Sequence, residues 1–230
     1  MATFSYGQTT AEEDLIEEVE YHADRVLATG QTIGLNYEAI YGNLVKAMRH
    51  VLNTAPRFAV DKAAADGSGQ TANNVNEYTE VVLPDDFSRF MDLRFEDWKR
   101  SVFELTDPRS SQVRLQYNAK TQADAQNPVA AKVPDPGGAS GEAIWAWPQD
   151  TTPTITRFTY VQEQAPEDIP QLLKEAVILK ATSYTLAAGK EEGWQIMDSA
   201  YQQIITQIEA GQQPMVQQAI QKARELENQS

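Results

Sequence analysis

The chain has 230 residues, 41% of them hydrophobic and 23% charged, which fits a folded protein of one large domain or one domain with an elaboration. It contains no cysteine, and this excludes disulfides, thiolate zinc sites and cysteine nucleophiles. The formal net charge is −14 and Lys99-Arg100 is the only adjacent basic pair, so the chain lacks the basic patch of a protein that binds nucleic acid through its phosphates.

The negative charge permits two interpretations. An acidic wall repels DNA and would let it slide past without sticking, whereas many proteins are acidic for solubility alone. No apolar run approaches the roughly 18–20 residues of a membrane span. Residues 1–6 have no basic stretch followed by an apolar one, so we expect neither a membrane protein nor a secretory signal.

Two amphipathic helices are predicted near the N-terminus. Thr10 and Glu13 have the spacing of a capping box, which predicts a helix over about 10–29. A second helix is predicted over about 36–53, and the short connection at 31–35 makes the two a helical hairpin. Their apolar stripes are Leu15, Val19, His22 and Val26 in the first helix, and Ile40, Leu44, Ala47 and Val51 in the second.

Strands and long loops are predicted in the middle of the chain. Residues 61–77 are mostly small and polar and predict a long exposed arm. Alternation of apolar and polar residues predicts strands within 78–105 and a further short strand at 113–117. A second polar loop follows over 120–141, in which residues 129–133 could pair as a short strand.

A hairpin is predicted from residues 142–148 and 154–161, joined by a polar turn with prolines at both ends. Large apolar side chains of its second strand fall on both faces: Ile155, Phe158, Tyr160 and Val161. Either both faces are partly covered, or a β-bulge shifts the phase of the alternation.

Three helices are predicted in the C-terminal part. The first starts near 166 or 168 and ends at 188 before Gly189, and its apolar residues all round indicate burial on several sides. The second spans about 191–210 and ends at Gly211. The last, over about 213–227, is polar and glutamine-rich, and its narrow apolar stripe suits a partner better than a monomer.

These elements predict an α+β fold in a single domain over 1–230. It is a helical bundle of two N-terminal and about three C-terminal helices, over about 10–53 and 166–228, with an inserted antiparallel β elaboration and long loops over about 61–162.

No motif indicates catalysis. The acidic runs Glu12-Glu13-Asp14 and Asp85-Asp86 fit the first turn of a helix and a chain turn better than an acid–base pair. His22 follows Glu18 by four residues, which predicts a surface pair rather than a metal site, and His50 has no such neighbour. Residues 67–69 read Gly-Ser-Gly without the Lys-Ser/Thr of a phosphate loop. We predict no catalytic, cofactor-binding or metal-ligating residue and no cofactor.

The most informative segment is residues 81–90. A β-branched run ends in a Leu-Pro-Asp-Asp-Phe sequence at 83–87, where Pro84 closes the strand and the aspartates would hydrogen-bond nearby backbone N–H groups. A Trp-Lys-Arg element follows at 98–100, then Tyr-Asn at 117–118 and Pro-Val-Ala-Ala at 128–131.

With two helices before it and long helices after it, this order of elements resembles the head-to-tail adaptor proteins of short-tailed bacteriophages, most closely the ring or tail-adaptor proteins of crAss-like phages. The resemblance covers about two-thirds of the chain and depends on order more than on any single motif.

The resemblance implies a structural virion protein and not an enzyme. It implies a homo-oligomeric ring of about twelve copies in the neck or tail, made in the cytoplasm of the bacterial host, with the portal protein and adjacent tail or ring proteins as partners. DNA would pass through the ring without specific binding, during retention of the packaged genome and during ejection, and no membrane would be involved. The subunit would stay monomeric until the portal templates it.

The alternative is a non-catalytic accessory or carbohydrate-binding module. Aromatic side chains of the predicted hairpin would then form a stacking surface: Trp145, Trp147, Phe158 and Tyr160.

Overall fold

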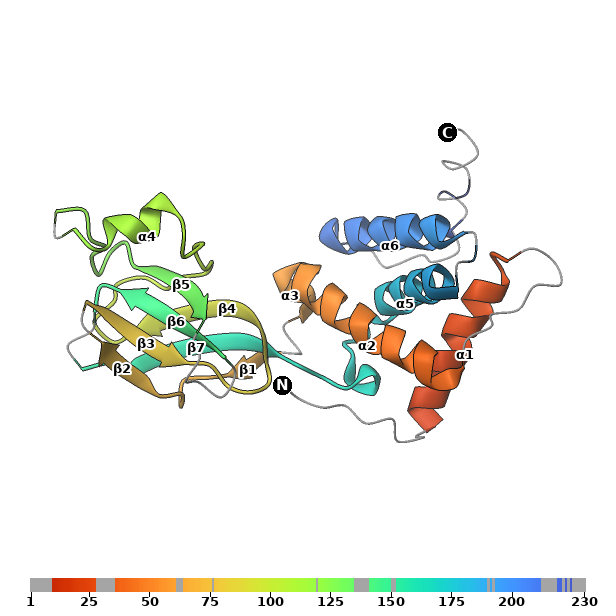
Figure 1. Ribbon diagram of the computed structural model, residues 1–230, viewed down its shortest axis with the longest axis horizontal. Helices are drawn as coiled ribbons and strands as arrows, with labels where there is room; N and C mark the ends of the chain where they lie inside the picture. The colour runs from red at the N-terminus through yellow and green to blue at the C-terminus, as the bar shows by residue number, and fades with distance from the viewer. Residues whose placement is uncertain are drawn as a thin grey trace. The chain divides into compact units, whose positions relative to one another are not determined.

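The structure, a computed structural model, describes residues 10–27, 36–60, 64–75, 77–118, 120–134, 141–149, 152–189, 191, 193–211, 219, 220, 222 and 224. Within these residues, helices and two antiparallel sheets form the mixed α+β fold that the sequence predicts (Figure 1). The chain divides into two compact units, where the sequence predicts one domain with an insertion. Ala64–Glu163 form the β unit, and the segments on either side of it together form the helical unit.

The helical unit is arranged around one central helix, α5. Its elements are α1 (Thr10–Asp24), α2 (Tyr37–Thr54), α3 (Arg57–Val60), the 3-10 turn η2 (Pro166–Asp168), α5 (Lys174–Gly189) and α6 (Trp194–Glu209). Helices α1, α2 and α6 all pack against α5. Ten residues of α5 are buried, on every side of the helix, and this confirms the predicted burial on several sides.

Local sequence explains where two of these helices begin. The side chain of Asn36 accepts a hydrogen bond from the Ala39 N–H at 2.9 Å and caps α2 at the predicted position. Helix α5 begins later than predicted, at Lys174. The residue before a proline avoids the helical region, and Ile169, before Pro170, has an extended ψ of 134°.

The turn between α5 and α6 lies against the end of α1. Gly193 has a φ of +91°, and a Cβ atom added there would lie 2.1 Å from Cγ1 of Val26. Glycine is therefore needed both for its backbone conformation and for the close approach of Val26.

The predicted helix at 213–227 falls mostly outside the described residues. Of its described residues, Ala219 and Ile220 are buried, and the Arg224 guanidinium donates a hydrogen bond to the Arg25 carbonyl at 2.6 Å. The described part therefore contacts its own chain, whereas the sequence suggested a surface for a partner.

The β unit is a pair of packed antiparallel sheets. The three-stranded sheet has the order β1 (Ala64–Asp66), β7 (Ile155–Gln162), β4 (Phe87–Phe95). The four-stranded sheet has the order β2 (Ala72–Val75), β3 (Tyr78–Val82), β6 (Glu142–Trp147), β5 (Val129–Pro134). Side chains from both sheets share one hydrophobic core, which includes Phe90, Leu93, Phe95, Ile144 and Phe158.

Two predictions about these strands are wrong. The predicted arm at 61–77 contains β1 and β2, which are short strands of small and polar residues at the sheet edges. Their backbone pairing with β7 and β3 holds them, so they need few apolar side chains. The predicted hairpin is also absent, because β6 and β7 belong to different sheets.

Three further predictions concern single elements. Both alternatives predicted for β7 are observed: its pairing with β4 shifts register between Arg157 and Ile155, which places Ile155 in the core with Phe158, and Val161 is buried as well. The predicted strand at 129–133 is confirmed as β5. The predicted strand at 113–117 is wrong, because these residues contribute to a short helix, α4 (Ser111–Leu115), whose first turn is capped by the Ser110 hydroxyl.

Candidate interaction surfaces

The Leu-Pro-Asp-Asp-Phe turn carries the chain from one sheet to the other, from β3 to β4. The Phe87 N–H donates to the Pro84 carbonyl at 3.1 Å, and the Glu163 N–H donates to the Asp86 carbonyl at 2.6 Å. The Asp86 carboxylate accepts a hydrogen bond from the Tyr160 hydroxyl at 3.0 Å. The sequence predicted backbone N–H partners for the aspartates, whereas the described partner of this carboxylate is a side chain from β7.

The Trp-Lys-Arg element has a structural tryptophan and exposed cations. Trp98 is buried, lies edge-on to Phe95 with ring centroids 4.9 Å apart, and donates its indole N–H to the Pro148 carbonyl at 3.3 Å. Lys99 and Arg100 are exposed. The tryptophan of this element therefore belongs to the core of the β unit, and its two cations lie on the surface.

The aromatic surface proposed as a carbohydrate platform does not form. Trp147 and Phe158 are 0% exposed and Tyr160 is 6% exposed. Phe158 and Tyr160 belong to the core between the sheets, whereas Trp147 packs with Val113 under α4. Only Trp145 of the four is partly exposed, so the burial of the other three removes the basis of that alternative.

A different aromatic cluster lies on the outer face of the four-stranded sheet. Tyr78 stacks on Trp145 with ring centroids 4.4 Å apart, and Tyr117 meets Trp147 edge-on at 6.3 Å. The Trp145 indole N–H donates to the Glu80 carboxylate at 3.3 Å. These aromatic rings therefore pack mainly against one another, and their contacts attach the segment after α4 to the sheet.

Residues 101–107, which we call the strap, border a recess in the β unit. Val102 exchanges two backbone hydrogen bonds with Leu93 of β4, of 2.8 and 2.9 Å. Four residues later, the Thr106 N–H donates to the Ala130 carbonyl of β5 at 2.8 Å. Since β4 and β5 are edge strands of different sheets, the strap joins two sheet edges.

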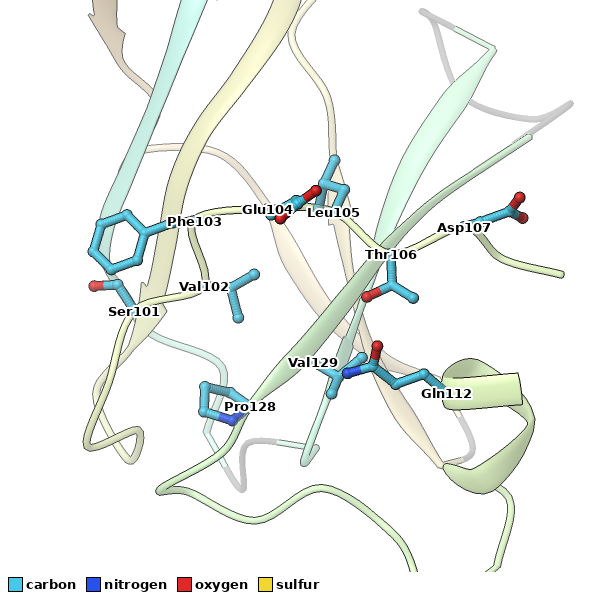
Figure 2. Close-up of a pocket in the computed structure, with 10 residues that line it drawn as sticks. All are labelled: Ser101, Val102, Phe103, Glu104, Leu105, Thr106, Asp107, Gln112, Pro128 and Val129. Carbon is cyan, nitrogen blue, oxygen red and sulfur yellow. The ribbon is translucent and has the colours of Figure 1, made fainter. Parts of the chain in front are cut away.

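The strap and β5 meet at Thr106 and diverge toward Phe103 and Pro128, which leaves a recess of about 540 Å³ that we call the notch. Figure 2 shows Val102 and Thr106 on the strap, facing Pro128, Val129 and the amide of Gln112 across this space.

The exposed lining of the notch is mostly polar, and its rim is acidic. Val102 and Val129 are buried, whereas Phe103 is 51% exposed. Glu104 and Asp107 are exposed, and no lysine or arginine is among the lining residues. No local pattern in the sequence marks this site, because its parts come from three separate segments of the chain.

The helical unit contains a buried polar network. The Lys180 ammonium, in a residue 8% exposed, forms an ion pair with Asp198 and lies 5.0 Å from the ring centroids of both Tyr184 and Tyr201. His50 stands 5.7 Å from the Tyr201 ring, and burial, followed by the nearby Lys180 charge, lowers its pKa. The network joins α2, α5 and α6 and gives His50 a packing role.

The acidic first helix is partly buried. Glu12 is only 3% exposed, whereas Glu13, Asp14 and Glu17 are exposed. His22 is 8% exposed and lies edge-on to Tyr21, so it is buried where the sequence predicted a surface position, although Glu18 is close enough for its charge to act on the imidazole. Burial, followed by the Arg25 charge, lowers the pKa of His22.

Metal-binding groups do not cluster in the part of the chain that the structure describes: no three His, Asp or Glu side chains there could hold an ion together. In that same part, no helix is both long and apolar enough to span a membrane. No protein-family model matches the chain, and no curated protein matches it significantly.

Proposed function

We propose that the protein is a structural subunit of a ring in the neck or tail of a short-tailed bacteriophage. The ring joins the portal to the tail and conducts DNA during ejection. About twelve copies form it, a number taken from the family that the sequence resembles. The virion is its place of action, after synthesis in the host cytoplasm.

The observation that carries this proposal is the order of the elements. Both ends of the chain form the helical unit, and the β unit is inserted between them in the sequence. Within the β unit, the Leu-Pro-Asp-Asp-Phe turn connects the two sheets. The Trp-Lys-Arg element comes shortly after the end of β4, and α5 and α6 complete the helical unit. This is the order of the adaptor family named above.

Exposed apolar side chains on both units support an assembly role. Large hydrophobic side chains are between 41% and 57% exposed at six positions: Tyr21, Phe58, Phe103, Leu115, Tyr117 and Trp194. Such residues gather at protein–protein interfaces, where aromatic side chains contribute much of the binding energy.

The charge of the chain supports passage of DNA without binding. At −14, the protein has too few cations to release many counterions from a duplex. A titration with duplex DNA at about physiological salt tests this part of the proposal. Binding tighter than about 1 µM that weakens with added salt would contradict it, because non-specific binding even by basic proteins is about 10⁻⁴–10⁻⁶ M.

The decisive experiment measures the mass of the purified protein with and without the portal protein of its phage, together with imaging of virion necks. We expect a monomer alone and a closed ring on the portal. A protein absent from virions and monomeric with every phage partner would overturn the proposal.

A further inference from the structure

Helix α1 presents a stripe of carboxylates to the solvent. Glu13, Glu17, Glu20 and Asp24 follow one another at steps of four, three and four residues, so they share one face of the helix. Glu20 is partly exposed and the other three are exposed, and none of the four side chains makes a hydrogen bond or ion pair with another described residue. No other described helix or strand contains more than two acidic residues. We call these four residues the acidic stripe.

A segment of opposite charge lies on the β unit. Residues 109–120, which we call the basic segment, include α4 and carry the cations Arg109, Arg114 and Lys120. No acidic residue occurs from 108 to 123. All three cations are exposed, and their side chains make no hydrogen bond or ion pair with a described residue. The basic segment is therefore a positive surface on a chain of net negative charge.

Both surfaces also carry exposed apolar side chains. In the basic segment, Leu115 is 46% exposed and Tyr117 is 53% exposed. On α1, Tyr21 follows the third residue of the acidic stripe and is 57% exposed, even with the Arg25 guanidinium 5.5 Å from its ring centroid. Each surface therefore combines charge with apolar contact area, as protein–protein interfaces do.

Other cations of the β unit are less available to an acidic partner. Lys99 and Arg100 closely follow two acidic residues, at 96 and 97, which offset their charge. Lys132 and Arg157 each form an ion pair within the chain.

We propose that the basic segment of one copy docks on the acidic stripe of the next copy. Arg114 and Lys120 meet the carboxylates of the stripe, and Leu115 packs beside Tyr21. Opposite charges favour this pairing over contact of either surface with itself. Because the two surfaces differ, the contact is head-to-tail and repeats until a ring closes. This inference rests on the proposed ring and names the contact between its subunits.

The absence of cysteine from the chain makes a direct test available. Two single-cysteine proteins, Ser111→Cys and Glu17→Cys, are mixed with the portal and treated with a short bismaleimide crosslinker, one of them carrying a tag that changes its mass. Both positions are exposed, and Ser111→Cys leaves the cations of the basic segment in place. A link between the two different chains is intermolecular by construction.

The matched control pairs Glu17→Cys with Asn73→Cys. Asn73 is an exposed polar residue of β2, at the edge of the four-stranded sheet opposite to β5, whereas α4 packs on β5 through Val113.

We expect the mixed dimer for the Ser111 pair at a yield several-fold above that of the Asn73 pair. Rings of the expected mass with no excess over the control would overturn the inference and leave the ring proposal standing. A protein that stays monomeric on the portal would overturn both. Duplex DNA binding that is lost in Arg114→Glu, with no excess crosslinking, would overturn the inference and assign the basic segment to nucleic acid.

Charge reversal gives a second, independent measurement, in which the readout is the protein concentration needed to form rings on the portal. Arg114→Glu should raise this concentration by about tenfold, because it places like charges opposite one another. Adding Glu17→Arg should restore much of the loss, since the exchanged charges attract again. Lys46→Glu makes the same charge change at an exposed position of α2 and should alter the concentration little. Failure of the double variant to recover, with all variants folded by circular dichroism, would contradict the proposed pairing of charges.

Discussion

The contact of Gly193 with Val26 predicts how the end of α1 is attached to the turn before α6. In Gly193→Ala the new Cβ would lie 2.1 Å from Cγ1 of Val26, a distance that forces one of them to move. The φ of +91° adds a backbone cost of about 1–2 kcal/mol for any residue with a Cβ. Crowding adds about 1–3 kcal/mol, toward the lower end if the half-buried Val26 can rotate away.

Gly211 offers a matched control for the backbone part of this cost. Its φ is +71°, but a Cβ there would meet no atom within 4 Å, so Gly211→Ala should cost only about 1–2 kcal/mol. Gly193→Ala should cost about 2–5 kcal/mol in total. Adding Val26→Ala removes Cγ1 and should return most of the difference between the two alanine variants.

Urea denaturation followed by circular dichroism at the helical wavelength measures these free energies of unfolding. The double-variant cycle between Gly193→Ala and Val26→Ala should show a coupling of about 1–3 kcal/mol. If Gly193→Ala costs no more than Gly211→Ala, or the coupling is near zero, the close approach of α1 to this turn is refuted.

Two further predictions concern buried polar groups. Asp198→Asn leaves the buried Lys180 ammonium without its carboxylate and should destabilise the protein by about 2–3 kcal/mol. This loss is smaller than for a fully buried pair, because the Asp198 side chain is 32% exposed. Lys180→Met should change the free energy of unfolding by no more than about 1 kcal/mol. Equal losses in urea denaturation would contradict this. Burial, followed by the hydrogen bond to Asp86, raises the pKa of Tyr160 from 10.0 to about 12, so its contribution to stability is complete below pH 10 and is lost as the pH rises through about 12. Tyr160→Phe should therefore flatten the alkaline fall in unfolding free energy between about pH 10 and 12, and an unchanged slope would show that another group causes it.

Local signals in the sequence predicted elements whose stability comes from their own residues and their own burial. The predicted start of α2 at about residue 36 agrees with the structure, in which the Asn36 side chain accepts a hydrogen bond from the Ala39 N–H of the first turn. The apolar residues on all sides of α5 predicted its central position, since a helix of that kind needs neighbours all round. The apolar residues of β7 likewise predicted either coverage of both faces or a bulge, and the strand shows buried side chains on both faces and a register shift near Ile155.

Only the tertiary structure decided features that depend on pairing between distant segments. Strands β1 and β2 have little apolar sequence, and backbone hydrogen bonds to β7 and β3 define them. The alternation of Val113, Leu115 and Tyr117 predicted a strand, yet the last two side chains are exposed and the Ser110 cap favours a helix. Neighbouring elements in sequence need not pair either, as β6 and β7 show.

The notch illustrates the same limit for function. The sequence by itself determined an acidic, cysteine-free α+β chain with an inserted β segment in which apolar and acidic residues alternate with other polar ones. Which of those residues gather at one place was decided when the strap joined β4 to β5 through Val102 and Thr106. That convergence involves sequence separations of nine and about twenty-five residues, and no local pattern of side chains specifies it, because the bonds that create it are made by backbone atoms that every residue carries.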